Sequence, residues 1–248
     1  MKRLALISRG SVAAVALFLG CARGFTQMQA APVSAAIGRL FGDNPSFTAK
    51  ANVQVLDDAR LEIYHLPMTF AMQDRSLRSE ADLAQMTSRE VGPEVVAQYK
   101  KLGIERVVSI TRPDKKAVYL IFPSSRAYVN SPMTKDEIEA SAKNLQLQKT
   151  PLGQEKIDSH PCTKNRATVK GPGGTVLEAL TWNASDLKDF PVQIETAEGG
   201  RIVVLKFSDI QFGKPDAALF EVPPGYKQYK DPQTLIQENS KRAGEAPH

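Results

Sequence analysis

The segment "HPC" holds the one histidine and cysteine that lie close together in the sequence, His160 and Cys162. Side chains two positions apart lie on the same face of a strand, so a cysteine–histidine dyad is conceivable there. A zinc site would need further ligands, and the sequence has neither a CxxC nor an HxxxH motif. Because a lone cysteine most often behaves as a small hydrophobic residue, we favour a strand start with a partly buried thiol. The segment therefore predicts no catalytic residue, metal site or cofactor.

Other catalytic signatures are missing from the sequence, which contains no G-x-S-x-G, H-E-x-x-H, P-loop or dinucleotide-binding motif. The glycine-rich "GPGGT", residues 171–175, lacks the following Lys-Ser/Thr and lies between expected strands, so it predicts a hairpin turn. The acidic residues are dispersed and define no carboxylate pair. We expect a protein that is not an enzyme.

The segment "TWNASDLKDFP", residues 181–191, contains the single tryptophan. Trp182 could stack on a ligand, although a tryptophan more often fills a core and donates a hydrogen bond through its indole N–H. Asp186 and Asp189 are expected to cap turns and not to bind metal.

Residues 1–24 predict a secretory signal peptide, because basic residues precede the apolar run "VAAVALFL" and small residues follow it. The run is too short for a stable membrane span. Cleavage before Phe25 fits the small residues there, and a later cut after Ala35 is also open. A third processing, at "LFLGC", would leave Cys21 as the lipid-modified residue of a lipoprotein. Each of these places the protein outside the cytoplasm, in the periplasm or at the envelope.

The basic charge of the chain belongs mostly to this N-terminal segment. The formal net charge is +5 and the pI is about 9.1. Removing residues 1–24 removes four basic residues and no acidic one, which leaves a charge of +1. The electrostatic case for a nucleic-acid partner therefore disappears.

Period-2 alternation, as in "FTAKANVQVLD", predicts about nine to eleven short antiparallel strands joined by Gly, Pro and Asp turns. Helices are expected in "GPEVVAQYKKLG" and in "TKDEIEASAKNLQLQK", where Thr134 and Glu137 suggest a capping box, and a short one in "SAAIGRLFG". The predicted fold is mainly β (α+β): a single curved antiparallel sheet or incomplete β-barrel, with two or three helices covering one face.

The domain is expected over residues 46–229, after a tether at 25–45 and before a disordered polar tail at 230–248. In "ALFEVPPGYKQY", residues 218–229, the apolar residues read as the last strand of the sheet. Pro223 and Pro224 cannot donate backbone hydrogen bonds, so we expect strand pairing to stop there.

Several expected strands are apolar on both faces, whereas an antiparallel sheet with one wet face should alternate cleanly. The second face could be buried by the protein itself, which we favour, or covered by an apolar ligand in a groove. Under the ligand hypothesis the binding residues would be Tyr119, Ile121, Trp182, Val203, Leu205 and Phe207.

The order of motifs supports a family resemblance. "FTAKANVQV", "VVSITRPDKKAVYLIFPSSRAY", "LGQEKIDSHPCTKNR", "TWNASDLKDFPVQI" and "FSDIQFGKPDAALFEVPPGY" follow one another over residues 45–230. This order resembles an uncharacterised family of secreted bacterial proteins, itself similar to the LolA/LolB lipoprotein-carrier superfamily and the stress sensor RseB. The resemblance implies a half-barrel with helices over an apolar concave face, which receives acyl chains in the carriers, and no enzymatic activity.

Together these features predict a non-catalytic exported envelope protein that binds an apolar ligand, a lipid or acyl chain, in a concave sheet cavity. The alternative is a periplasmic protein-interaction or sensor module without ligand transport, whose partner would be an envelope protein. Membrane attachment is expected only through a lipid anchor at Cys21.

Overall fold

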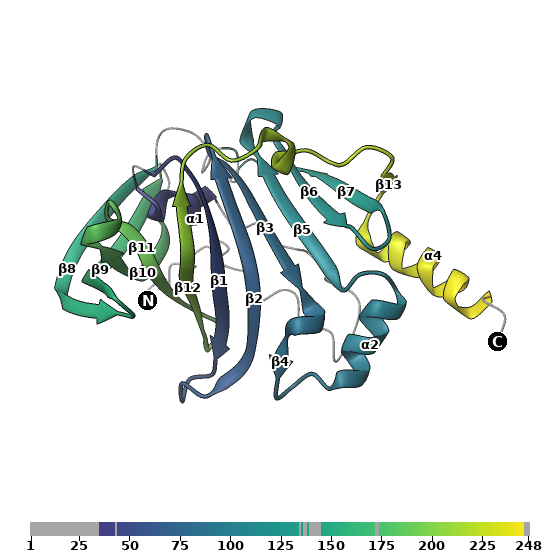
Figure 1. The fold of residues 1–248 in the computed structure, drawn as a ribbon, viewed down its shortest axis with the longest axis horizontal. Coiled ribbons are helices and arrows are strands. Elements are labelled where there is room, and N and C mark those ends of the chain that lie inside the picture. Colours follow the sequence, from purple (N-terminus) through teal and green to yellow (C-terminus); the bar gives the residue numbers. More distant parts are fainter. Residues whose placement is uncertain are drawn as a thin grey trace, which may run out of the picture.

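A computed structural model describes residues 35–42, 44–133, 135, 138, 145–171 and 174–245 (Figure 1). The predicted signal peptide and Cys21 lie outside the described residues. So does most of the helix expected in "TKDEIEASAKNLQLQK", including its capping box at Thr134 and Glu137. The last four residues of that segment, 146–149, are not helical but begin a strand.

One curved, unclosed sheet dominates the part of the chain that the structure describes, and it contains 13 strands against the nine to eleven predicted. Neighbouring strands are antiparallel, except that β13 runs parallel to β7. The spatial order is β13-β7-β6-β5-β3-β2-β1-β12-β11-β10-β9-β8, and β4 also pairs with β2. The predicted fold class is confirmed. The strands are β1 (Ser46–Leu56), β2 (Glu62–Gln73), β3 (Ser76–Asp82), β4 (Thr87–Ser88), β5 (Arg106–Arg112), β6 (Ala117–Phe122), β7 (Ala127–Pro132), β8 (Gln146–Ile157), β9 (His160–Gly171), β10 (Gly174–Ala184), β11 (Phe190–Glu198), β12 (Arg201–Phe212) and β13 (Lys227–Tyr229).

Three helices contribute buried side chains to one large hydrophobic cluster, which we call the inner core. They are α1 (Ala35–Leu40), α2 (Pro93–Lys101) and α4 (Pro232–Glu245). Helix α2 begins at a proline and is followed by Gly103 with φ of 64°, as its sequence predicts. Within the described residues no helix is long and apolar enough to cross a membrane.

Helix α1 belongs to the domain, which corrects the expectation that residues 25–45 form a tether. Ile37, Leu40 and Phe41 are buried in the inner core. The Phe41 ring lies 4.7 Å from Phe47 and 5.5 Å from Phe207, measured between centroids. The sequence conceals this role because the segment is short and lies among small residues.

Helix α4 corrects the expectation of a disordered tail after residue 229. The Asp231 carboxylate accepts a hydrogen bond from Thr234 N at 2.7 Å and so caps the first turn, with proline at the first helical position. Leu235 is fully buried, and Asn239 donates to the carbonyl oxygen of Leu102 at 2.8 Å. The helix is thus fastened to the end of α2.

The segment 213–226, which we call the strap, runs from β12 to β13 over the outer face of β5 and β6 (Figure 1). The prediction that this segment contains the last strand of the sheet is wrong, because Ala217–Phe220 form a 3-10 helix. Strand pairing also resumes after the two prolines, at β13. Apolar residues of the strap pack on the sheet in a second cluster, the outer cluster: Ala71, Val108, Ile110, Ile121 and Phe220, flanked by Tyr119, Tyr128, Leu219, Val222 and Tyr226.

Polar contacts hold the strap in place. Arg112 donates to the carbonyl oxygen of Phe220 at 2.9 Å and to the carboxylate of Glu221 at 2.6 Å. Lys115 donates to the same carboxylate at 2.7 Å. Hydrogen bonds from Lys115 and Arg112 lower the pKa of Glu221 below its ordinary value.

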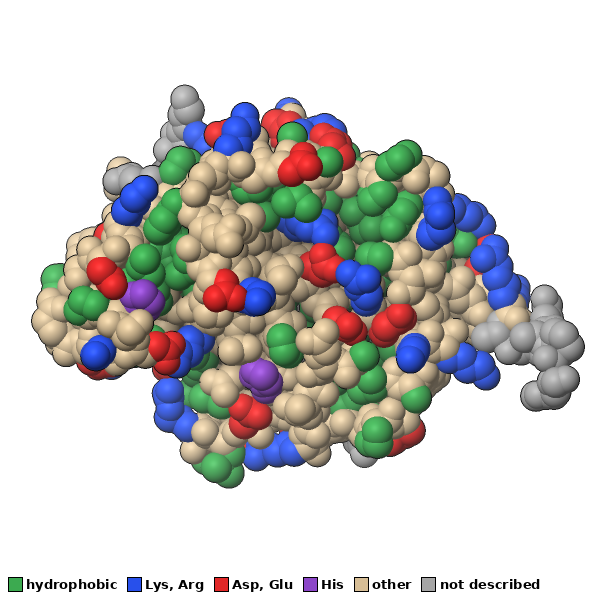
Figure 2. Space-filling view, in the orientation of Figure 1, with side chains coloured by type: hydrophobic (Ala, Val, Ile, Leu, Met, Phe, Trp, Pro, Cys, Tyr) green, Lys and Arg blue, Asp and Glu red, His purple; other side chains and the backbone are tan. Residues whose placement is uncertain are grey.

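Charges of both signs are interspersed on the face seen in Figure 2, which shows no extended basic surface there.

Truncating the buried anchor of the strap should loosen it. We expect Phe220→Ala to lower the free energy of unfolding by about 3 kcal/mol, since a buried phenylalanine leaves a cavity, as measured by urea denaturation. Leu219→Ala, in the same 3-10 helix but partly exposed, is the control and should cost clearly less. Equal losses in the two variants would contradict the anchoring role.

Candidate ligand-binding site

The inner face of the sheet is the apolar surface against which α1 packs. Along β12, Val203, Leu205 and Phe207 point to this face, opposite Val55, Val53 and Ala51 of the neighbouring strand β1. Every second residue of a strand lies on the same face, so each strand adds a row of apolar side chains. The buried rows continue through β2, β3, β5, β6 and β7 on one side and through β11, β10 and β9 on the other.

The six residues predicted to bind a ligand are not brought together. Val203, Leu205 and Phe207 lie on the inner face, where all three are buried. Ile121, 2% exposed, belongs to the outer cluster, and Tyr119 packs against it. The strap therefore covers the second apolar face of β6, as the self-burial interpretation predicts, and the six residues are divided between two clusters.

Trp182, a residue of β10, also belongs to the inner core. Thr181 donates to Asn183 at 2.7 Å, which puts those two side chains on one face of β10 and Trp182 on the other. The indole N–H donates to the Glu155 carboxylate at 2.6 Å, and the Lys164 ammonium lies 4.8 Å from the ring centroid. Trp182 is thus buried and satisfied by its own neighbours, which is the expected structural role.

Aromatic side chains fill the inner face below α1. Phe41 contacts Phe47, Phe190 and Phe207, with ring centroids 4.7, 5.4 and 5.5 Å apart. These tilted and edge-on contacts are the preferred geometries for aromatic pairs. Phe41 therefore occupies the space over Phe207 that a ligand at this end of the inner face would need.

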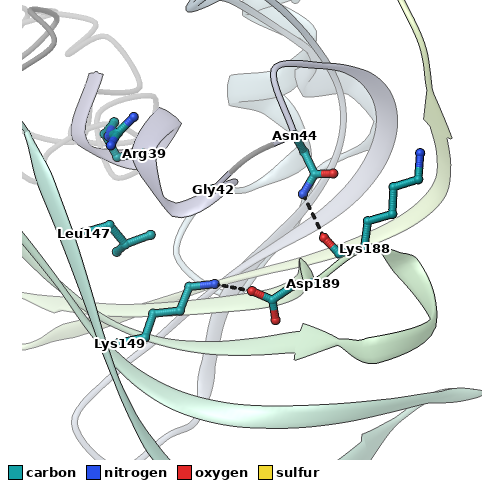
Figure 3. Close-up of a pocket in the computed structure, with 7 residues that line it drawn as sticks. All are labelled: Arg39, Gly42, Asn44, Leu147, Lys149, Lys188 and Asp189. Atoms are coloured by element: carbon teal, nitrogen blue, oxygen red, sulfur yellow. Dashed lines mark hydrogen bonds and ion pairs between the residues drawn. The ribbon is translucent and has the colours of Figure 1, made fainter.

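A cleft of about 410 Å³ opens beside α1, between the end of that helix, β8 and the turn that leads into β11 (Figure 3). Its lining comes from segments far apart in the sequence. The lining residues are Arg39, Gly42, Asn44, Leu147, Lys149, Lys188 and Asp189.

Buried amides build the wall of the cleft. Asn183 donates to the carbonyl oxygen of Asp189 at 2.8 Å, and Asn44 donates to that of Lys188 at 3.2 Å. These bonds hold two successive residues, Lys188 and Asp189, at φ of 53° and 58°, the left-handed region that side chains other than glycine disfavour. Asn44 also donates to the carbonyl oxygen of Phe41, so the same wall is joined to α1.

The lining of the cleft carries three cations and one carboxylate. Lys149 and Asp189 form an ion pair at 2.6 Å (Figure 3), and the Lys188 ammonium lies 4.9 Å from the Phe212 ring centroid. Asp189 was expected to cap a turn, but its carboxylate binds Lys149 instead. Sequence reasoning missed Arg39 and Lys149 because it placed one in a tether and the other in a helix.

His160 and Cys162 do not form a dyad in the described contacts. The imidazole Nδ1 of His160 lies 2.8 Å from the Asp186 carboxylate, and the Cys162 thiol donates to the backbone carbonyl of His160 at 3.4 Å. Burial raises the pKa of the thiol above its ordinary value, the reverse of what an activated nucleophile needs. Within the described residues no group of three His, Cys, Asp or Glu side chains could hold a metal ion.

Comparisons with known proteins give similarity in structure alone. No family model and no curated protein matches the chain. A LolA superfamily protein from Nitrosomonas europaea matches with a TM-score of 0.39 and 11% identity, over 76% of this chain and 98% of that one. The lipoprotein LppX from Mycobacterium tuberculosis gives 0.37 and 12%, over 76% and 94%, and LprF from Mycobacterium bovis gives 0.37 and 13%, over 77% and 97%. At these values the similarities say nothing about ligand or activity.

The reactivity of the Cys162 thiol tests whether Cys162 and His160 form a catalytic dyad. We expect Cys162, 1% exposed, to resist iodoacetamide at pH 8 in the folded protein and to react fully in urea. Mass spectrometry of the peptide that contains Cys162 measures the modified fraction. Rapid alkylation of the folded protein at neutral pH would contradict this prediction and support a reactive thiol.

Proposed function

We propose that the chain is an exported, non-catalytic envelope protein that binds an apolar ligand, a lipid or an acyl chain, on the inner face of its sheet. The observation that carries the proposal is the continuous apolar surface of the inner core on a sheet that does not close. Such a surface suits a flexible hydrocarbon chain, because it offers contact area without directional bonds.

The ligand would take the place of the Phe41 side chain, with α1 remaining beside it. Burying one phenylalanine side chain contributes about 1.5–3 kcal/mol, and each buried methylene of an acyl chain about 0.8 kcal/mol. About two to four methylenes of an acyl chain could therefore replace what the Phe41 side chain contributes.

The alternative, an interaction module that uses its sheet edge, has less support from the geometry. Strand β8 is the long edge of the sheet and is largely exposed. It carries Pro151, an irregular register between Pro151 and Gly153, and the charged residues Lys149 and Lys156. Prolines, bulges and lysines are the features that prevent an edge strand from pairing with another chain.

Opening the inner face should increase ligand uptake. We expect Phe41→Ala to bind cis-parinaric acid several-fold more tightly than the wild-type chain, because the removed ring no longer competes for the site. Fluorescence titration measures the affinity.

Ile121→Ala is the matched control, since Ile121 is equally buried but lies in the outer cluster. It should lose comparable stability, about 2–5 kcal/mol, without any gain in uptake. Native mass spectrometry of protein purified from the host envelope would complement this test. If neither folded wild-type protein nor folded Phe41→Ala takes up the fatty acid, and no lipid co-purifies, the proposal fails.

A further inference from the structure

We propose that the cleft beside α1 binds an anionic oxygen-bearing group, a phosphate or a carboxylate, and that it receives the headgroup of the ligand whose apolar part lies on the inner face. The second half of this statement rests on the proposed function, whereas the first half rests on the cleft alone.

The charge of the cleft favours an anion. Arg39 and Lys149 line the cleft together with one carboxylate, Asp189, which leaves a formal charge of +1 on these three side chains. The Lys188 side chain points away from the cleft, and its ammonium lies over the Phe212 ring (Figure 3). Guanidinium and ammonium groups are the side chains that bind phosphate and carboxylate oxygens.

The ion pair between Lys149 and Asp189 is suited to exchange. The Lys149 side chain is 23% exposed and the Asp189 side chain 65% exposed. A carboxylate so exposed gains little from the pair and can return to water at small cost. An incoming phosphate can then take its place at the Lys149 ammonium and gain Arg39 as a second cationic neighbour.

Leu147 connects the cleft to the inner core. It lies two positions before Lys149 on β8, and hence on the same face of that strand, lines the cleft and packs against the inner core. A cationic group and an apolar group thus lie side by side at the entrance below α1 (Figure 3). This arrangement suits an amphiphile with its charged end in the cleft and its chain directed towards Phe41.

Charge-neutralising substitutions test the anion site in the full-length chain. We expect Arg39→Gln combined with Lys149→Gln to weaken binding of inorganic phosphate at least tenfold in calorimetric titration. Lys206→Gln is the matched control, because Lys206 also forms an ion pair with an aspartate, at 2.8 Å from Asp158, but does not line the cleft. Unchanged phosphate binding in the double variant, or an equal loss in the control, would overturn the proposal.

Vesicles distinguish a lipid headgroup from a free anion. Preferential binding to phosphatidylglycerol–phosphatidylcholine vesicles over phosphatidylcholine vesicles, lost in the double variant and kept in Lys206→Gln, supports a headgroup site. Phosphate binding without that preference supports a site for free anions and overturns the headgroup assignment. Uptake of cis-parinaric acid by the wild-type protein tests the proposed function separately. If the protein binds phosphate specifically but takes up no cis-parinaric acid, the proposed function fails and the anion site is still supported.

Discussion

Both faces of the strands β5 and β6 are apolar, and the fold depends on keeping each of them from water. Along β6, Leu120 and Phe122 enter the inner core, whereas Ile121 enters the outer cluster. An antiparallel sheet with one solvated face would alternate apolar and polar residues, so this one needs two covers. The helices α1, α2 and α4 contribute to the inner cover, and the strap forms the outer one.

The two covers account for the path of the C-terminal part of the chain. After β12 the chain crosses the outer face as the strap, and β13 then joins the edge of the sheet beside β7. Helix α4 follows and places Leu235 in the inner core. The last 33 residues that the structure describes, 213–245, thus cover first the outer face and then part of the inner face.

Elements with a local pattern could be predicted, and those that depend on distant partners could not. Alternation found β1, and Pro93 with Gly103 bounded α2. The apolar residues Leu219, Phe220 and Val222 were misleading, because a strap that packs on a sheet also buries apolar residues at short intervals. For α4 the capping signal of Asp231 and Pro232 was present, but its apolar side is narrow. The cleft joins Arg39, Lys149 and Asp189 through strand pairing and buried amides, which no local pattern encodes.

The two covers differ in the contacts that hold them. The strap combines buried Phe220 with charged hydrogen bonds from Arg112 and Lys115, so lifting it breaks apolar and ionic contacts together. The contacts described for α1 are mostly apolar, with an additional hydrogen bond from Asn44 to the carbonyl oxygen of Phe41. Apolar contact is not directional, and an acyl chain can supply it as well as a phenylalanine can. The cover of the inner face at α1 therefore depends more on apolar contact than the strap does.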